Sequence, residues 1–138
     1  MDSGKVLALR FSSDPRRLKV VRARVTEAAE SCGCGTKLTS ELVIAINEAC
    51  MNIMQHAYKG DCSREIVLEI LNNGDELEFK LTDFAEPVDA TQIASRDLDE
   101  VRPGGLGTYF MQQLMDECAY GHLDEGKGNF LRMKKKIS

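Results

Sequence analysis

One uninterrupted helical segment, residues 41–58, constrains the fold of this chain more than any other stretch. It contains no glycine or proline, and at about 100° per residue its apolar side chains share one broad arc. That arc comprises Leu42, Val43, Ile46, Ala49, Cys50, Ile53, Met54 and Ala57. A side-chain oxygen of Thr39 or Ser40 can cap its first turn. We therefore expect an amphipathic helix around which the other elements are arranged.

The opposite arc of this helix carries Glu41, Glu48, Asn52 and Gln55, with His56 at its border. No lysine or arginine interrupts it, although solvent-facing arcs usually carry such residues. Glu48 and Asn52 are four residues apart and therefore neighbours on the helix. Carboxylate and amide oxygens suit a hard cation such as Mg²⁺. The pair indicates either a metal site or an ordinary polar face, and His56 either orients that site or bonds locally.

Length and composition favour a single globular domain over residues 1–138. Hydrophobic residues make up 43% of the chain and charged residues 29%, and the net charge is −4. This negative charge argues against direct binding to nucleic acid or to a membrane surface. No apolar run reaches the roughly 20 residues that cross a bilayer, and the first residues lack the apolar region of a signal peptide. We expect a cytoplasmic protein with no membrane contact.

Five cysteines, an odd number, are scattered along the chain without a repeated Cys-x-x-Cys. The pattern favours reduced thiols in a reducing compartment, some of them filling the core. A metal site that combines Cys32, Cys34 and a histidine is the alternative interpretation.

Residue patterns on both sides of the central helix predict the remaining elements. Strands are expected at residues 5–11, 66–71, 77–81, 118–123 and 129–137, and further helices at about 15–31 and 108–117. The earlier of these helices has a basic side, which is either a solvated face or a docking surface. Asn72-Asn73-Gly74-Asp75 is a hairpin turn signal. Strands and helices do not alternate regularly, so we expect an α+β fold: a two-layer α/β sandwich with a mostly antiparallel sheet and helices on one face.

A glycine cluster, Gly104-Gly105-Leu106-Gly107, precedes the helix expected at 108–117. Free N–H groups at a helix start bind anions, and glycine lets a phosphate approach the backbone. The cluster is neither a Walker A loop nor a Rossmann fingerprint, because no Gly-Lys-Ser/Thr follows and no strand precedes it. Residues 85–103 show no periodicity, and loops of that length are often functional lids.

Three pieces, taken in order, resemble a known ATP-binding fold. They are the helix with Glu48-x-x-x-Asn52-x-x-x-His56-Ala57-Tyr58, a strand ending in Asp83, and a long loop that leads into the glycine cluster. This order resembles the Bergerat-type fold of gyrase, Hsp90, histidine kinases and MutL. Within that superfamily the chain most resembles the bacterial anti-sigma factor serine/threonine-protein kinases. The resemblance covers nearly the whole chain and implies ATP and Mg²⁺ as cofactors.

The resemblance also implies a role for each matching residue. Glu48 matches the base that activates the attacking hydroxyl or water, and Asn52 matches the asparagine that holds Mg²⁺. Asp83 matches the aspartate that accepts a hydrogen bond from the adenine amino group. The other implied nucleotide contacts are Ala85, Arg102, Gly104, Gly105, Leu106, Gly107 and Thr108, with an ATP lid at about residues 88–103.

Three positions depart from the family pattern. Ala85 occupies the glycine position of the usual Asp-x-Gly; its methyl group is tolerable at negative φ and costly at positive φ. Arg102 is the candidate for an arginine that reaches the γ-phosphate, but the extra glycine shifts it by about one residue. Asn129 stands where the family often has a threonine.

The function implied by the resemblance is transfer of the γ-phosphate of ATP to a serine or threonine of an anti-anti-sigma (STAS-type) partner. In its other state the same molecule would sequester a sigma factor, and the family implies a homodimer. The alternative is a nucleotide-dependent partner-binding regulator without useful phosphotransfer, because Ala85 alters the adenine box. The catalytic half of a sensor histidine kinase is not expected, since residues 1–13 leave no room for a phosphoacceptor helix.

Overall fold

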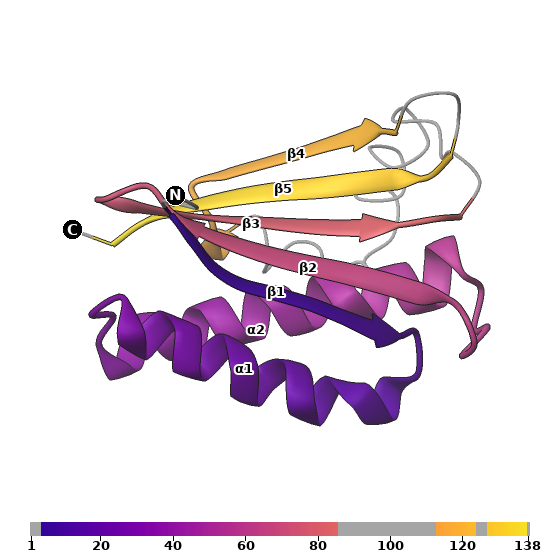
Figure 1. Ribbon diagram of the computed structural model, residues 1–138, viewed down its shortest axis with the longest axis horizontal. Coiled ribbons are helices and arrows are strands. Elements are labelled where there is room, and N and C mark those ends of the chain that lie inside the picture. Colours follow the sequence, from indigo (N-terminus) through magenta and orange to yellow (C-terminus); the bar gives the residue numbers. More distant parts are fainter. Residues whose placement is uncertain (1–3, 86–112, 124–126, 138) are drawn as a thin grey trace.

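The computed structural model describes residues 4–85, 113–123 and 127–137 (Figure 1). Its elements are β1 (Lys5–Ser12), the 3-10 turn η1 (Pro15–Arg17), α1 (Leu18–Ser31), α2 (Thr36–Asn52), the π-helical turn η2 (Ile53–Ala57), β2 (Glu65–Asn72), β3 (Glu76–Asp83), β4 (Glu117–His122) and β5 (Asn129–Lys136). The strands form one layer, and α1 and α2 form a second layer across one face of the sheet (Figure 1).

The sheet has the strand order β1-β2-β3-β5-β4, and each neighbouring pair is antiparallel. This arrangement confirms the expected α+β sandwich with helices on one face. The β2–β3 connection is the turn that the sequence indicates: the Gly74 N–H donates to Asn72 Oδ1 at 2.8 Å. Gly74 has φ 104°, a conformation that glycine adopts without a steric penalty.

Strict alternation along the central strands sends every second side chain toward the helices. The buried side chains of this face are Ile66, Leu68, Ile70, Leu77, Phe79, Leu81, Leu131 and Met133. They pack with buried side chains of the two helices, among them Val21, Val25, Leu42 and Ile46. The other face carries ion pairs such as Lys5–Glu69, with Nζ and Oε2 3.0 Å apart. The core therefore lies between the layers.

The start of α2 differs from the expected one. The helix begins at Thr36 with Gly35 at the N-cap, so a cap at Thr39 or Ser40 is wrong. Thr39 instead lies buried within the first turn, where its hydroxyl donates to the Cys34 carbonyl. The earlier start adds a turn in which Leu38 packs partly against the core. A capping motif in the sequence carries no information about this tertiary contact.

The end of α2 also departs from an ordinary α-helix. After Asn52 the chain makes a π turn, in which the Tyr58 N–H donates to the Ile53 carbonyl at 2.9 Å. Lys59 and Gly60 then adopt positive φ values of 51° and 85°, which ends the helix. The expected α-helix through Tyr58 is therefore wrong in its last turn, and π turns of this kind often occur at functional sites.

The last expected helix lies mostly outside the described residues. Residues 113 and 114 are helical, and Met115 is buried in the core as its apolar pattern predicts. The expected end at residue 117 is wrong, because Glu117 begins β4 and pairs with Lys134.

The five cysteines are free thiols. Cys50 lies wholly in the core, and burial raises its pKa to about 12, as expected for a core-filling thiol. Within residues 4–85, 113–123 and 127–137, no three His, Cys, Asp or Glu side chains gather as a metal site. In the same ranges, no helix is both long and apolar enough to cross a bilayer.

The central strand generates a stability prediction. Leu81 is fully buried between Leu68 and Leu131, so Leu81→Ala should lower the free energy of unfolding by about 2–5 kcal/mol through lost burial and a residual cavity. Ile44→Ala on α2 is the control, because Ile44 is half exposed and its loss should change that free energy by about 0.5 kcal/mol or less. Urea denaturation measures both, and equal losses would contradict the placement of the core.

Candidate functional site

A buried carboxylate lies at the end of β3. Asp83 is only 5% exposed, and its Oδ1 accepts hydrogen bonds from the Ala85 N–H and from Asn129 Nδ2, both at 3.0 Å. Burial raises the pKa of Asp83, and these hydrogen bonds and the charge of Arg64 offset part of that effect. A carboxyl group with a pKa shifted by burial is a common mark of a functional site.

In the sequence, Asn129 stands out only because it differs from the family's usual threonine, yet in the structure it contacts the Asp83 carboxylate directly. It lies opposite Asp83 in the β3–β5 register and opposite His122 in the β4–β5 register. Since its Nδ2 faces Asp83, its Oδ1 is the acceptor for His122 Nδ1 at 2.8 Å. The three polar side chains therefore form one row across three strands. Only the strand register, which the sequence does not fix, could have revealed it.

Ala85 is buried just beyond β3, and its N–H closes a turn onto Asp83 two residues earlier. Lys59 is the one non-glycine residue with positive φ in the part of the chain that the structure describes. Ala85 therefore has a φ at which its methyl group introduces no backbone strain. This meets the condition under which alanine is tolerated at the family's glycine position.

Gly128 allows the start of β5 to approach the end of β3. A Cβ at this position would lie 2.2 Å from the Asp83 carbonyl oxygen and 3.1 Å from the Phe84 Cα. Any side chain would thus displace the backbone beside the buried carboxylate. The sequence pattern places Gly128 in a turn and gives no sign of this second role.

Glu48 and Asn52 are half-buried neighbours near the C-terminal end of α2. Asn47 accepts a hydrogen bond from Arg22 of α1 at 3.0 Å, so it marks the flank that faces α1. At about 100° per residue, Glu48 and Asn52 fall on the other flank. Their oxygens could hold a hard cation that keeps several waters.

The two parts of the site come from elements that meet at one end of the molecule. α2 runs beneath the sheet toward the end at which β3 finishes (Figure 1). The Phe84 N–H, next to Asp83, donates to the hydroxyl of Tyr58 at 2.7 Å, directly after the π turn of this helix. The structure thus links the helix of Glu48 and Asn52 to the turn of Asp83 and Ala85.

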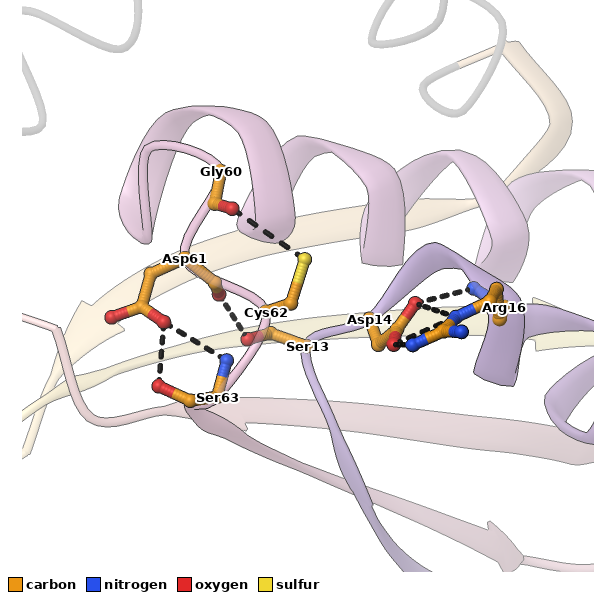
Figure 2. Close-up of polar contacts among 7 residues, drawn as sticks. All are labelled: Ser13, Asp14, Arg16, Gly60, Asp61, Cys62 and Ser63. Atoms are coloured by element: carbon orange, nitrogen blue, oxygen red, sulfur yellow. Dashed lines mark hydrogen bonds and ion pairs between the residues drawn. The ribbon is translucent and has the colours of Figure 1, made fainter.

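The connection after α2 is fastened to the β1–α1 turn (Figure 2). The buried Ser13 hydroxyl donates to the Asp61 carbonyl, and the Arg64 N–H donates to that hydroxyl at 3.1 Å. The Asp61 carboxylate accepts hydrogen bonds from both the N–H and the hydroxyl of Ser63, and the hydroxyl bond lowers its pKa most. These bonds fix the backbone of Arg64, whose Nη2 donates a hydrogen bond to the Phe84 carbonyl oxygen at 2.9 Å.

The remaining expected site residues lie outside the described residues. They are Arg102, Gly104, Gly105, Leu106, Gly107 and Thr108, together with the lid expected at about residues 88–103. The described part of the site therefore consists of Glu48, Asn52, Asp83 and Ala85, with Asn129, Tyr58 and Arg64 added by the structure.

Comparison with known families and proteins gives a consistent assignment. A family model described as the histidine kinase-like ATPase domain matches residues 11–135. The chain is similar to the serine-protein kinase RsbW of Bacillus subtilis (strain 168), with 30% identity over 119 residues that span 80% of this chain and 74% of the relative. RsbW of Listeria monocytogenes serovar 1/2a (strain ATCC BAA-679 / EGD-e) is 30% identical over 128 residues, which span 87% of this chain and 81% of that protein.

Two solved structures share the fold. The first contains the RsbU and RsbW domains of Rv1364c from Mycobacterium tuberculosis, with a TM-score of 0.66 and 16% identity over 95% of this chain and 31% of that longer one. The second is the SiaB-SiaC complex from Pseudomonas aeruginosa, with a TM-score of 0.72 and 12% identity over 98% of this chain and 90% of the matched one. At these identities the likeness establishes the architecture.

The raised pKa of Asp83 generates a prediction about stability. Asp83→Asn should unfold at the same or a higher temperature than wild type at pH 7, because the amide removes a buried charge while its oxygen can accept the same two hydrogen bonds. Because the pKa of Asp83 is higher in the folded state than in the unfolded state, protonation of its carboxyl group stabilises the fold. This stabilisation is complete below about pH 3.9, the ordinary pKa of an aspartate, and is lost as pH rises through the pKa of the folded state. Wild type should therefore approach the variant's melting temperature in acid.

Thermal unfolding at pH 7 and pH 3.5 measures this difference. Asp75→Asn, in the exposed β2–β3 turn, is the matched control and should not differ from wild type in this way. A melting temperature of Asp83→Asn clearly below that of wild type at pH 7 would show that the buried charge stabilises the fold.

Proposed function

The chain belongs to the histidine kinase-like ATPase domain family, among the relatives of the serine-protein kinase RsbW, and from that premise we propose that it is an ATP- and Mg²⁺-dependent anti-sigma factor serine/threonine-protein kinase. In this proposal it phosphorylates an anti-anti-sigma (STAS-type) partner and sequesters a sigma factor, acting as a single domain and as a homodimer. The buried, hydrogen-bonded carboxylate of Asp83 is the observation that carries the proposal beyond family membership.

Asp83 is the residue proposed to read the base. Both hydrogen bonds that it accepts from Ala85 and Asn129 use Oδ1, so we assign Oδ2 to the adenine amino group. Guanine presents a carbonyl oxygen at the same place, and two acceptors facing each other repel. A buried carboxylate thereby selects adenine through one hydrogen bond to a charged group, which is worth about 1.5–3 kcal/mol.

Asn52 is proposed to hold Mg²⁺ on the flank of α2 that faces away from α1. Its half-buried amide oxygen suits a cation that takes oxygen ligands and retains several waters. When bound, Mg²⁺ neutralises charge on the β- and γ-phosphates. The remaining proposed nucleotide contacts are Arg102, Gly104, Gly105, Leu106, Gly107 and Thr108, and residues 88–103 are proposed as the lid.

Glu48 is proposed to accept the proton of the attacking hydroxyl. The hydroxyl oxygen of the partner's serine or threonine forms a bond to the γ-phosphorus, and the bond from that phosphorus to the β–γ bridging oxygen breaks. The products are ADP and a phosphorylated partner, and the proton moves to the Glu48 carboxylate. Phosphoryl transfer needs mainly positioning and charge stabilisation, so a base and a metal-holding amide on one helix are sufficient in kind.

A partner-binding regulator without useful phosphotransfer is the second candidate. The departures at Ala85 and Asn129 favour it, because they change the surroundings of the base-reading carboxylate. The φ of Ala85 instead favours the kinase, since the methyl group does not strain this turn. The two candidates differ in one observable, the transfer of phosphate to a partner.

Substitutions on α2 separate the proposed base from the proposed metal-holding residue. Glu48→Gln should lower the phosphotransfer rate by about 10²–10⁴-fold and change ATP affinity little, because it removes a base and keeps the shape of the side chain. Asn52→Ala should lower both the rate and the Mg²⁺-dependent part of ATP affinity. Glu41→Gln, one heptad before Glu48 on the same helix, is the matched control.

The measurements are calorimetric ATP affinity with and without Mg²⁺, and transfer of labelled γ-phosphate to STAS-type partner proteins of the native cell. A wild-type rate in Glu48→Gln would remove the base assignment. Tight ATP binding by wild type with no phosphotransfer to any partner would favour the second candidate, and no ATP binding would exclude both.

A further inference from the structure

The backbone of Phe84, between Asp83 and Ala85, is held by side chains on both of its polar groups. Its N–H donates to the Tyr58 hydroxyl at 2.7 Å, and its carbonyl accepts from Arg64 Nη2 at 2.9 Å. The Phe84 side chain itself is exposed, so these contacts fix the main chain and leave the ring to solvent. With both of its polar groups bonded to side chains, the Phe84 main chain is held in one orientation.

The two holding residues form one unit. The Tyr58 ring is buried, and the Arg64 guanidinium lies over it, 4.8 Å from the ring centroid. Burial raises the pKa of Tyr58, so the hydroxyl keeps its proton at neutral pH and donates it to the Glu65 carbonyl while it accepts from Phe84. The hydroxyl thus joins the start of β2 to the end of β3.

Peptide planarity carries these contacts to the carboxylate. The Phe84 carbonyl and the Ala85 N–H belong to one rigid plane, so Arg64 also sets the direction of the N–H that bonds Asp83 Oδ1. The preceding plane holds the Asp83 carbonyl and the Phe84 N–H; Tyr58 bonds the N–H, and Gly128 approaches so closely that a Cβ there would clash with the carbonyl oxygen. Two consecutive peptide planes beside the carboxylate are therefore set from outside the turn.

The π turn explains how Tyr58 reaches this place. Its N–H bonds the carbonyl five residues earlier rather than four, so the turn contains one residue more than an α-helical turn and rotates Tyr58 relative to a continued α-helix. Glu48 and Asn52 lie on the same helix, just before the turn. The hydroxyl is consequently a direct link between that helix and the end of β3.

We propose that Tyr58 and Arg64 are positioning residues of the nucleotide site, which orient the Asp83 carboxylate toward the exocyclic amino group of the bound purine by holding the Phe84 peptide. The inference rests on the proposed function and adds to it the residues that set base selectivity. It predicts a loss specific to purines that carry the 6-amino group, which a general loss of stability would not produce.

The test compares ATP with inosine triphosphate, whose base has a carbonyl in place of the amino group. Tyr58→Phe should weaken ATP binding by about three- to tenfold, the size expected for one misaligned hydrogen bond, and inosine triphosphate binding by less than about twofold. Calorimetry measures both affinities on protein shown by circular dichroism to be folded. Tyr120→Phe, the same change at an exposed tyrosine of β4, should leave the ratio of the two affinities unchanged.

Arg64→Lys is the second variant, and it applies even if Tyr58→Phe does not fold. It keeps the positive charge near Asp83 and removes the guanidinium geometry, so it should also reduce the preference for ATP. An unchanged ATP preference in the folded variants, or an equal loss for both nucleotides, overturns the inference while leaving the proposed function intact. Wild-type protein that binds neither nucleotide overturns the proposed function and this inference together.

Discussion

The buried carboxylate of Asp83 is the constraint on which this end of the molecule depends. A charged group in that position destabilises the folded state unless donors surround it, and the chain supplies them from separate elements. Ala85 donates from the turn and Asn129 from β5, while the positive charge of Arg64 comes from the connection before β2. The close approach that Gly128 permits completes the enclosure. The Asp83 carboxylate opposes stability, yet several elements supply it with donors, as is common at recognition sites. The family assignment agrees with a recognition role for Asp83.

Local patterns predicted the elements and the architecture because they depend on period and turn chemistry. Alternation in β2 and β3 and the Asn72–Gly74 turn correctly indicate an antiparallel sheet with one buried face. The start of α2 was missed because tertiary packing of Leu38 outweighs a local capping signal. The π turn was missed because it preserves the apolar pattern and changes only the hydrogen bonding before Tyr58.

The candidate site was predictable only where a motif carries it. Glu48, Asn52 and Asp83 follow from their order along the chain, whereas Asn129 and Arg64 depend on strand register and on a loop fastened by Ser13. Contacts between residues 46 or 20 positions apart leave no periodic trace in one sequence. The departures have a similar explanation. Alanine is accommodated at position 85 because the local φ suits it, and asparagine at position 129 donates to the carboxylate directly.

The central claim is that adenine nucleotide binds where the end of β3 meets the C-terminal end of α2. Titration of Mg²⁺-ATP into ¹⁵N-labelled protein, followed by NMR, tests it most directly. The account predicts that the largest shift changes among the described residues occur at the backbone amides of Phe84 and Ala85 and at the side-chain amides of Asn52 and Asn129. It also predicts that the chemical shifts of the backbone amides of β1 and of the α1–α2 connection stay nearly unchanged. Shift changes concentrated on β1 or on that connection, or no saturable change at all, would contradict the account.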